Sequence, residues 1–122
     1  MQGLNFNIYA VDFDGTLCNS KWPELGPPNE AVVQYVKRIK ERGDKIILWT
    51  CRTGKMLEEA VCWCREQGLY FDAVNENLKE VQELYNGNCR KVSADYYIDD
   101  KSITPYMVSD IIDLINYLDE TF

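Results

Sequence analysis

The chain has 122 residues, of which 46% are hydrophobic, and a formal net charge of −7. This length suits one domain, residues 1–122, with a hydrophobic core of its own. The acidic balance argues against general nucleic-acid binding, because no basic stripe is available to displace the counterions of a phosphate backbone. No apolar run approaches membrane-spanning length, so we expect no membrane-embedded segment.

The five cysteines and the absence of histidine narrow the possible chemistry. An odd cysteine count, without a secretion signal in the first residues, favours free thiols, and we expect a cytoplasmic protein. Cys62 and Cys64 are two positions apart on a predicted helix, which is the wrong spacing for zinc ligands, so we expect Cys64 to pack in the core. Without histidine, Ser-His-Asp and Cys-His catalysis are excluded.

The first predicted strand, residues 7–12, runs into Asp12-Phe13-Asp14-Gly15. Because side chains alternate along a strand, Asp12 and Asp14 point the same way and Phe13 points the opposite way. Two neighbouring carboxylates at the end of an apolar strand repel each other, and a divalent cation or a shared proton makes such a pair tolerable. The alternative is a solvated acidic hairpin turn, although no second strand follows Gly15 at hairpin distance.

Helices and strands alternate along the rest of the chain. In order, we expect a loop over 15–28, a helix over 29–42, a strand over 45–50, a helix that ends at Gly68, a strand over 70–74, a short helix over 78–85, a strand over 96–98, and a last helix capped by Thr104 with Pro105 in its first turn. Such alternation predicts an α/β fold, in which a three-layer, Rossmann-like parallel sheet is flanked by helices.

Apolar periodicity predicts which side of each long helix faces the core. The expected buried positions are Val32, Val33, Val36 and Ile39 in the first helix, Leu57, Ala60, Val61 and Cys64 in the second, and Val108, Ile111, Ile112, Ile115 and Leu118 in the last.

Polar residues follow the end of every predicted strand. They are Asp12 and Asp14, then Thr50, then Asn75 and Asn77, and finally Asp99 and Asp100. The carboxyl ends of parallel strands meet at one edge of the sheet, where ligands bind in open α/β folds. We therefore expect these four clusters to converge on one site.

Four ordered motifs resemble those of the haloacid dehalogenase-like (HAD) superfamily of phosphoryl-transfer enzymes. They are Asp12-Phe-Asp-Gly-Thr-Leu17, Leu48-Trp-Thr50, Lys91 and Tyr97-Ile-Asp-Asp100. The resemblance implies a HAD-like fold and a phosphatase that hydrolyses a phosphate monoester. Larger members of the superfamily carry a cap domain, but neither residues 15–28 nor residues 51–90 leave room for one. We expect no cap domain and a comparatively open site.

The resemblance also implies catalytic roles. Asp12 is the expected nucleophile, which forms an aspartyl-phosphate. Asp14 is the expected general acid and then base, a role that needs a raised pKa. Thr50 and the Cys51 amide are expected to bind a phosphoryl oxygen. Taken alone, Thr50 also suits a strand-end residue that caps a turn.

Magnesium is the expected cofactor, since it prefers oxygen ligands and neutralises a phosphate. The resemblance implies ligation by Asp12, the backbone carbonyl of Asp14 and the Asp99 side chain, with Asp100 as a further ligand, directly or through water. The alternative is that Asp99 and Asp100 open a solvated turn before the last helix.

The basic residue at the phosphate is open between several positions. The superfamily pattern implies Lys91, while Lys79 and Lys55 lie near predicted helix starts at the same edge of the sheet. Each of the three also suits a solvated surface lysine. Arg52 is either an additional phosphate contact or a surface residue at the start of a helix.

The substrate is a phosphorylated compound whose identity the sequence does not reveal. An open site suits either a large phosphorylated partner or a small one enclosed by a second subunit of a homo-oligomer, and the loop around Trp22 is the candidate lid. The alternative function is a non-catalytic HAD-fold binding or regulatory domain. The intact pair of Asp12 and Asp14 favours the phosphatase.

Overall fold

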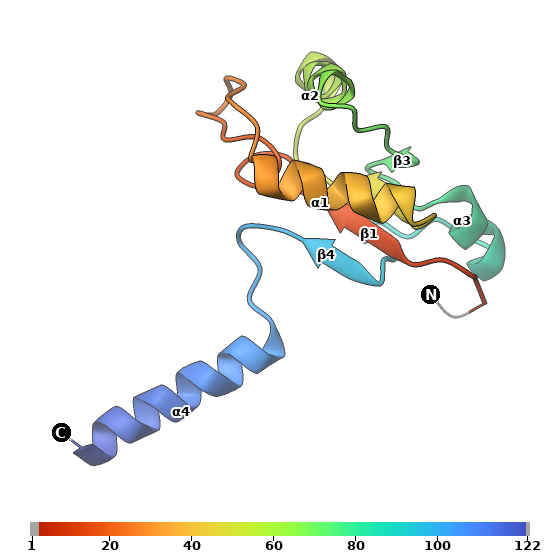
Figure 1. The fold of residues 1–122 in the computed structure, drawn as a ribbon. Helices are drawn as coiled ribbons and strands as arrows, with labels where there is room; N and C mark the ends of the chain where they lie inside the picture. The colour runs from red at the N-terminus through yellow and green to blue at the C-terminus, as the bar shows by residue number, and fades with distance from the viewer. Residues whose placement is uncertain (1–2, 122) are drawn as a thin grey trace.

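The computed structural model describes residues 3–121, which form four strands and four helices (Figure 1). In chain order they are β1 (Ile8–Val11), α1 (Glu30–Glu41), β2 (Lys45–Leu48), α2 (Gly54–Glu66), β3 (Ala73–Val74), α3 (Lys79–Tyr85), β4 (Tyr96–Ile98) and α4 (Pro105–Thr121). The strands are all parallel and lie in the order β3-β2-β1-β4. The predicted α/β class with a parallel, Rossmann-like sheet is confirmed.

Strand β1 lies in the middle of the sheet, and all four of its residues are buried. Val11, its last residue, pairs with Leu48 of β2 on one side and with Ile98 of β4 on the other. A parallel strand with both faces covered is expected to be apolar along its whole length, as Ile8–Val11 is. The register brings the ends of three strands to the same edge.

Two hydrophobic clusters lie on opposite faces of the sheet. On one face, α1 and α2 cover Tyr9 and Val11 of β1. On the other face, residues of α3 and the segment after it cover Ile8 and Ala10. The sheet is therefore the middle of three layers, and the two faces of β1 supply alternate residues to the two clusters.

Helix α1 buries Val33, Val36 and Ile39, as predicted, while Val32 is only partly buried. Helix α2 buries Ala60 and Cys64, also as predicted, and Leu57 and Val61 pack at the edge of the same cluster. Trp63, which the periodicity did not identify, is buried as well. Its indole N–H donates a hydrogen bond to the Gly26 carbonyl at 3.1 Å, so this position also anchors the loop that precedes α1.

The predicted strand over 70–74 is much shorter in the structure, where β3 contains only Ala73 and Val74. Before it, the Asp72 carboxylate accepts a hydrogen bond from the backbone N–H of Ile46 at 2.9 Å and pairs with the Lys40 ammonium. A side chain thus takes the place of a backbone acceptor at this end of β2. The polar side chain shortens the ladder in a way that the apolar pattern did not indicate.

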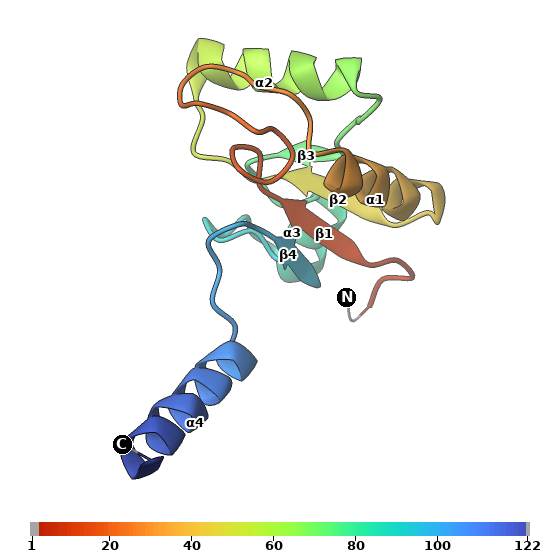
Figure 2. The same ribbon diagram turned by 60° about the vertical axis from the view of Figure 1, so that its left-hand side comes forward.

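Helix α4 forms where predicted, and the Thr104 hydroxyl accepts a hydrogen bond from the Met107 N–H at 3.3 Å. The predicted inward face is wrong, because its five side chains are between 42% and 51% exposed; they are Val108, Ile111, Ile112, Ile115 and Leu118. In Figures 1 and 2 the helix extends away from the sheet after β4. Periodicity specifies an apolar stripe on a helix, but it does not specify the surface that covers the stripe.

The loop between β1 and α1 contains isolated bridges, including Asp14 with Cys18 and Cys18 with Pro28, and no helix. Within residues 3–121, neither this loop nor the β2–β3 segment contains an inserted domain, in agreement with the expectation that there is no cap. None of the described helices has both the length and the apolar composition needed to cross a bilayer.

Candidate active site

Three carboxylates converge where β1 and β4 end. Asp12 follows β1, and its backbone N–H donates a hydrogen bond to the Ile98 carbonyl at 2.9 Å, which holds it beside the end of β4. Asp99 and Asp100 follow directly. One carboxylate oxygen from each of these three residues lies within 4.8 Å of the other two. The parallel register of neighbouring strands brings residues 12 and 99 together, as expected from the sequence.

Gly15 makes the approach of Asp100 possible. A Cβ atom at this position would lie 2.3 Å from Asp100 Oδ2, far inside van der Waals contact. Gly15 also has a φ of +80°, which an L side chain rarely adopts. The glycine of the Asp-Phe-Asp-Gly stretch is therefore required both by the turn and by the carboxylate that packs against it.

The neighbouring acids disfavour the charged form of Asp12. Burial and the nearby Asp99 carboxylate together raise the pKa of Asp12 to about 6, against a hydrogen bond from Thr16 that lowers it. The Thr16 hydroxyl donates to Asp12 Oδ2 at 3.0 Å. A set of hard oxygen donors this close together fits a divalent cation such as Mg²⁺, which would relieve the repulsion.

Asp14 does not join this cluster. Its two carboxylate oxygens accept hydrogen bonds from Arg52, at 2.9 Å from Nε and 2.8 Å from Nη2. Burial by itself would raise the pKa of Asp14, but the hydrogen bonds and the positive charge of Arg52 outweigh it and hold the pKa below its ordinary value. The predicted raised pKa of Asp14 is wrong, because its nearest charged partner is a guanidinium and not another acid.

Arg52 is buried and central to this part of the molecule. Its guanidinium lies over two aromatic rings, 5.2 Å from the Phe13 ring centre and 4.9 Å from the Trp22 ring centre. Nη2 also donates to the Pro23 carbonyl at 3.0 Å. The sequence suggested a phosphate contact or a surface residue; the structure shows a tie between Asp14 and the Trp22 loop. In the sequence, the feature that could have indicated this role was its position in the polar segment between β2 and α2.

Thr50 and Cys51 lie at the end of β2 and line the same cavity as the acids, as predicted. Asn75, after β3, accepts a hydrogen bond from the Thr50 N–H at 2.8 Å, and the Thr50 hydroxyl accepts one from the Arg52 N–H at 3.2 Å. Asn75 thus braces Thr50 but does not line the cavity, and neither does Asn77, so the expected convergence of four polar clusters is wrong for the cluster after β3. Asn77, also after β3, is buried and ties its own loop to Ser93.

The lysine expected at the phosphate is not where the sequence suggested. Lys91 lies over the ring of Tyr97, 5.5 Å from its centre, and does not line the cavity. Neither Lys55 nor Lys79 lines it either. Lys101 does, and its ammonium lies 3.0 Å from Asp100 Oδ2. Lys101 was not identified from the sequence, although it directly follows the two acids after β4.

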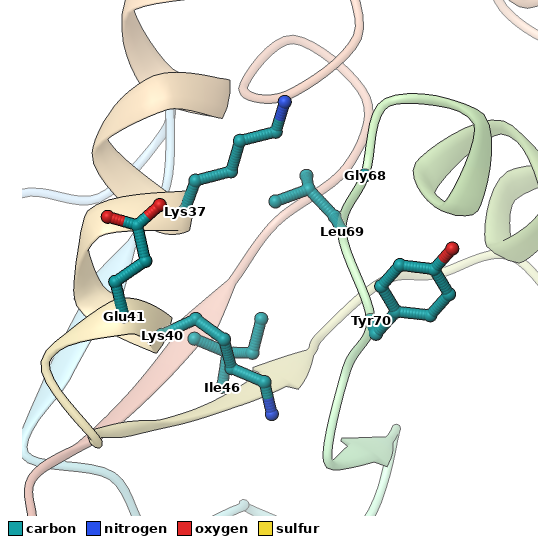
Figure 3. Close-up of a pocket in the computed structure, with 7 residues that line it drawn as sticks. All are labelled: Lys37, Lys40, Glu41, Ile46, Gly68, Leu69 and Tyr70. Carbon is teal, nitrogen blue, oxygen red and sulfur yellow. The ribbon is translucent and has the colours of Figure 1, made fainter.

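The cavity at this edge has a volume of about 400 Å³, and it is lined by Asp12, Asp14, Trp22, Thr50, Cys51, Asp99, Asp100 and Lys101. A hollow of similar size, about 390 Å³, lies between the C-terminal ends of α1 and α2 (Figure 3). Lys37, Lys40 and Glu41 line one side of that hollow, and Leu69 and Tyr70 line another. Lys40 is paired with Asp72, and no group of converging acids lies there. Among the described residues, the one group of three converging carboxylates lies at the carboxyl edge of the sheet.

No protein-family model and no curated protein matches this chain. A solved structure does match, that of a conserved protein from Bacteroides thetaiotaomicron, at 34% sequence identity and a TM-score of 0.71. The match covers 89% of this chain and 91% of the other. Identity at this level, over nearly the full length of both chains, shows common family membership. The chain therefore belongs to the same family as this conserved Bacteroides thetaiotaomicron protein.

Proposed function

We propose that this protein is a Mg²⁺-dependent phosphatase of the HAD-like type, which hydrolyses a phosphate monoester through an aspartyl-phosphate on Asp12. The observation that carries the proposal is the convergence of Asp12, Asp99 and Asp100, with carboxylate oxygens within 4.8 Å of one another, in a cavity that Thr50 also lines. Adjacent acids at the end of a buried strand lower the stability of the fold. Binding of a cation and an anionic substrate would account for their presence there.

The residues present fit magnesium. Asp12, Asp99 and Asp100 supply only oxygen donors, and the open cavity leaves room for the water ligands that Mg²⁺ retains. When bound, Mg²⁺ supplies positive charge between the nucleophilic carboxylate and the phosphate oxygens. We keep Asp12, Asp99 and the Asp14 carbonyl as the proposed ligands, with Asp100 as the further one.

Asp12 is oriented for attack by its neighbour. The Thr16 hydroxyl donates to Oδ2, which leaves Oδ1 as the oxygen without that contact. In the proposed first step Oδ1 forms a bond to phosphorus, and the bond between phosphorus and the leaving oxygen breaks. In the second step water attacks phosphorus, the bond to Oδ1 breaks, and inorganic phosphate and the Asp12 carboxylate are released.

Asp14 is the proposed proton carrier, and its contacts with Arg52 influence whether it is protonated. With both oxygens bound to Arg52, Asp14 is a carboxylate, which suits the acceptance of a proton from the attacking water in the second step. Donation of a proton to the leaving group in the first step requires that one Arg52 contact opens and that Asp14 first takes up a proton from solvent water. The paired state also suits the alternative function, a non-catalytic binding domain, because a binder needs no free acid.

Thr50 and Lys101 are the proposed contacts to the phosphoryl oxygens. The Thr50 hydroxyl oxygen accepts a bond from the Arg52 N–H, so its own hydrogen is available to donate into the cavity. Lys101 lines the cavity beside Asp100 and takes the role for which Lys91 was the sequence-based candidate. The ammonium compensates the charge of the bound phosphate.

The test is hydrolysis of p-nitrophenyl phosphate and a panel of phosphate monoesters, with Mg²⁺ and with EDTA. We expect turnover with Mg²⁺ and none with EDTA. No turnover on any member of the panel would favour the binding domain. A crystal grown with Mg²⁺ and aluminium fluoride tests the site directly. We expect the fluoride beside Asp12, and fluoride bound elsewhere, for example at Gly54, would contradict the site.

A further inference from the structure

Trp22 is the single aromatic residue among the described residues that line the cavity. It lies in the loop between β1 and α1, and 59% of its surface is exposed. Large aromatic side chains are usually buried for most of their surface, because they gain the most from leaving water. Several tyrosines are as exposed as Trp22, but Trp22 is the exposed aromatic residue that lines the cavity with the acidic cluster, where a ligand could reach its ring.

The indole is held in place on one face. The Arg52 guanidinium lies 4.9 Å from the ring centre, and Arg52 is itself fixed by the two hydrogen bonds to Asp14 and the one to Pro23. Cation–π contact with a desolvated guanidinium favours a flat stacking of the ring. The ring orientation is therefore set before any ligand arrives, which lowers the entropic cost of a second stacked group.

A purely structural role, in which Trp22 only shields Arg52, does not account for the exposure. Phe13 also contacts the guanidinium, with its ring centre at 5.2 Å, and does so while completely buried. Trp22 covers Arg52 with one face, and an exposed fraction of 59% leaves the other face largely open. The open face belongs to a residue that lines the same cavity as Asp12 and Thr50.

The cavity is also larger than a phosphate group requires. Its volume of about 400 Å³ lies within the range of sites that hold small organic ligands, roughly 300–1,000 Å³. A flat ring stacked on Trp22 would use the part of the cavity that the phosphate and the acids leave free. Aromatic side chains bind nucleobases in this way, with little dependence on which base is present.

We propose that Trp22 is a stacking platform for an aromatic ring carried by the leaving group of the substrate. The substrate class is then a phosphate monoester with a flat ring close to the phosphate, either one sugar away, as in a nucleoside monophosphate, or directly attached, as in an aryl phosphate. This inference rests on the proposed phosphatase function for its kinetic test, and a binding test separates the two.

The kinetic test compares pairs of substrates that differ in the ring. Adenosine 5′-monophosphate is paired with ribose 5-phosphate, and phenyl phosphate with ethyl phosphate. Each is assayed with Mg²⁺ on the wild type, Trp22→Ala, Trp22→Phe and the control Tyr70→Ala. Tyr70 suits the control because it is 62% exposed, which is close to Trp22, and lies at the other hollow.

We expect Trp22→Ala to raise KM about tenfold for at least one ring-bearing substrate, which corresponds to about 1.4 kcal/mol of binding. KM for its ring-free partner should change less than about twofold, on the same scale of tenfold per 1.4 kcal/mol. Trp22→Phe should keep most of the preference, and Tyr70→Ala should behave as the wild type. The pair that shows the effect distinguishes a nucleotide from an aryl ester.

An equal effect of Trp22→Ala on ring-bearing and ring-free substrates would overturn the proposal, because loss of a support for Arg52 would act on both alike. The absence of any effect would overturn it as well. Thermal unfolding of each variant identifies a folding defect. If Trp22→Ala has such a defect, Trp22→Phe becomes the deciding variant, and the proposal requires that it retains the preference for the ring-bearing substrate.

The binding test does not depend on turnover. Adenosine 5′-thiomonophosphate, which phosphatases hydrolyse slowly, is titrated calorimetrically with Mg²⁺ into the wild type, Trp22→Ala and Tyr70→Ala. We expect weaker binding to Trp22→Ala alone. Such binding without phosphatase activity would refute the proposed function and support the platform. Turnover combined with binding that does not depend on Trp22 would support the proposed phosphatase function and refute the stacking platform.

Discussion

The carboxyl edge of the sheet and helix α4 differ in what holds their side chains. At the edge, the acids are fixed by neighbouring side chains, from the Thr16 hydroxyl on Asp12 to the two hydrogen bonds from Arg52 to Asp14. In α4, the apolar stripe that includes Ile111 and Ile115 is about half exposed. The first region is defined by contacts between distant segments, and the second by its own local periodicity.

This difference separates two kinds of stability. The loops at the edge are braced by side-chain hydrogen bonds that span up to 38 residues of sequence, such as the contact between Arg52 and Asp14. A change there is felt by several segments at once. Helix α4 depends on backbone hydrogen bonds and its Thr104 cap, so a change to one side chain stays local. The predictions that follow test this contrast, beginning with the largest expected effect.

Replacement of the proposed nucleophile should give the largest effect. Asp12→Asn should lower kcat by about a thousandfold or more, because an amide cannot form the aspartyl-phosphate. The measurement is turnover of the best substrate from the phosphate panel with saturating Mg²⁺. The matched control is Asp113→Asn, which changes an acid on α4 and should leave the rate unchanged. Residual activity above a tenth of wild type would show that Asp12 is not the nucleophile.

The buried guanidinium gives the next effect. Arg52→Met should lower the free energy of unfolding by about 3 kcal/mol, because it leaves Asp14 and the Pro23 carbonyl without their donor. Urea unfolding measures this, with Arg38→Met as control. Arg38 is an exposed residue of α1, and its replacement should cost less than about 1 kcal/mol. Equal losses in the two variants would contradict the role given to Arg52.

The same variant tests the proton carrier. Without Arg52, the pKa of Asp14 should rise, because burial remains while the strongest hydrogen bonds and the charge that lower it are lost. The alkaline limb of the kcat/KM profile, which reports loss of the acid in the free enzyme, should then move to higher pH. An unchanged limb would show that a group other than Asp14 donates the proton.

Metal binding gives a moderate effect that depends on pH. At ten times its Kd, Mg²⁺ should stabilise the protein by about 1.4 kcal/mol, and Asp99→Asn should remove most of that gain. The pKa of Asp12 in the metal-free protein is about 6, so below that pH a proton must leave before the cation binds. The rise in Tm caused by Mg²⁺ should be full at pH 7.5 and small at pH 5. A Mg²⁺ effect that is equal at both values would argue against Asp12 as a ligand.

The metal-free protein should show the opposite trend. A carboxyl whose pKa is raised on folding binds its proton more tightly in the folded state than in the unfolded state. Between the ordinary carboxyl pKa of 3.8 and about 6, the contribution of Asp12 to stability therefore falls as pH rises. Asp12→Asn should remove this dependence, which thermal unfolding in EDTA across that range measures.

Helix α4 gives the smallest effect. Ile111→Ser combined with Ile115→Ser should change the free energy of unfolding by less than about 0.5 kcal/mol for each site, because both side chains are about half exposed. Ile47→Ala, at a fully buried site in β2, should cost about 3 kcal/mol by comparison. A large loss from the α4 pair would show that its stripe is covered, either by the sheet or by a second copy of the chain.

The outcome at individual residues shows which kinds of prediction succeed. Asp12, Asp99 and Thr50 were expected at one edge, and the structure places all three around one cavity. That inference needed only the strand ends and the rule that parallel strands share an edge. Lys91 and Asp14 turned out differently, because the path of the loop before β4 and the reach of the Arg52 side chain depend on packing that no local pattern encodes.

The amino-acid sequence by itself determined the alternation of strands and helices, the parallel sheet and the positions of acids after its strands, since these follow from local periodicity and from the geometry of parallel strands. Tertiary structure alone decided that Arg52 reaches across 38 residues to Asp14, that Lys101 lines the cavity, and that the stripe on α4 faces outward. The reason is physical. The partners of a side chain depend on where distant segments lie in the folded protein, whereas the secondary structure of a residue depends mostly on its neighbours in the chain.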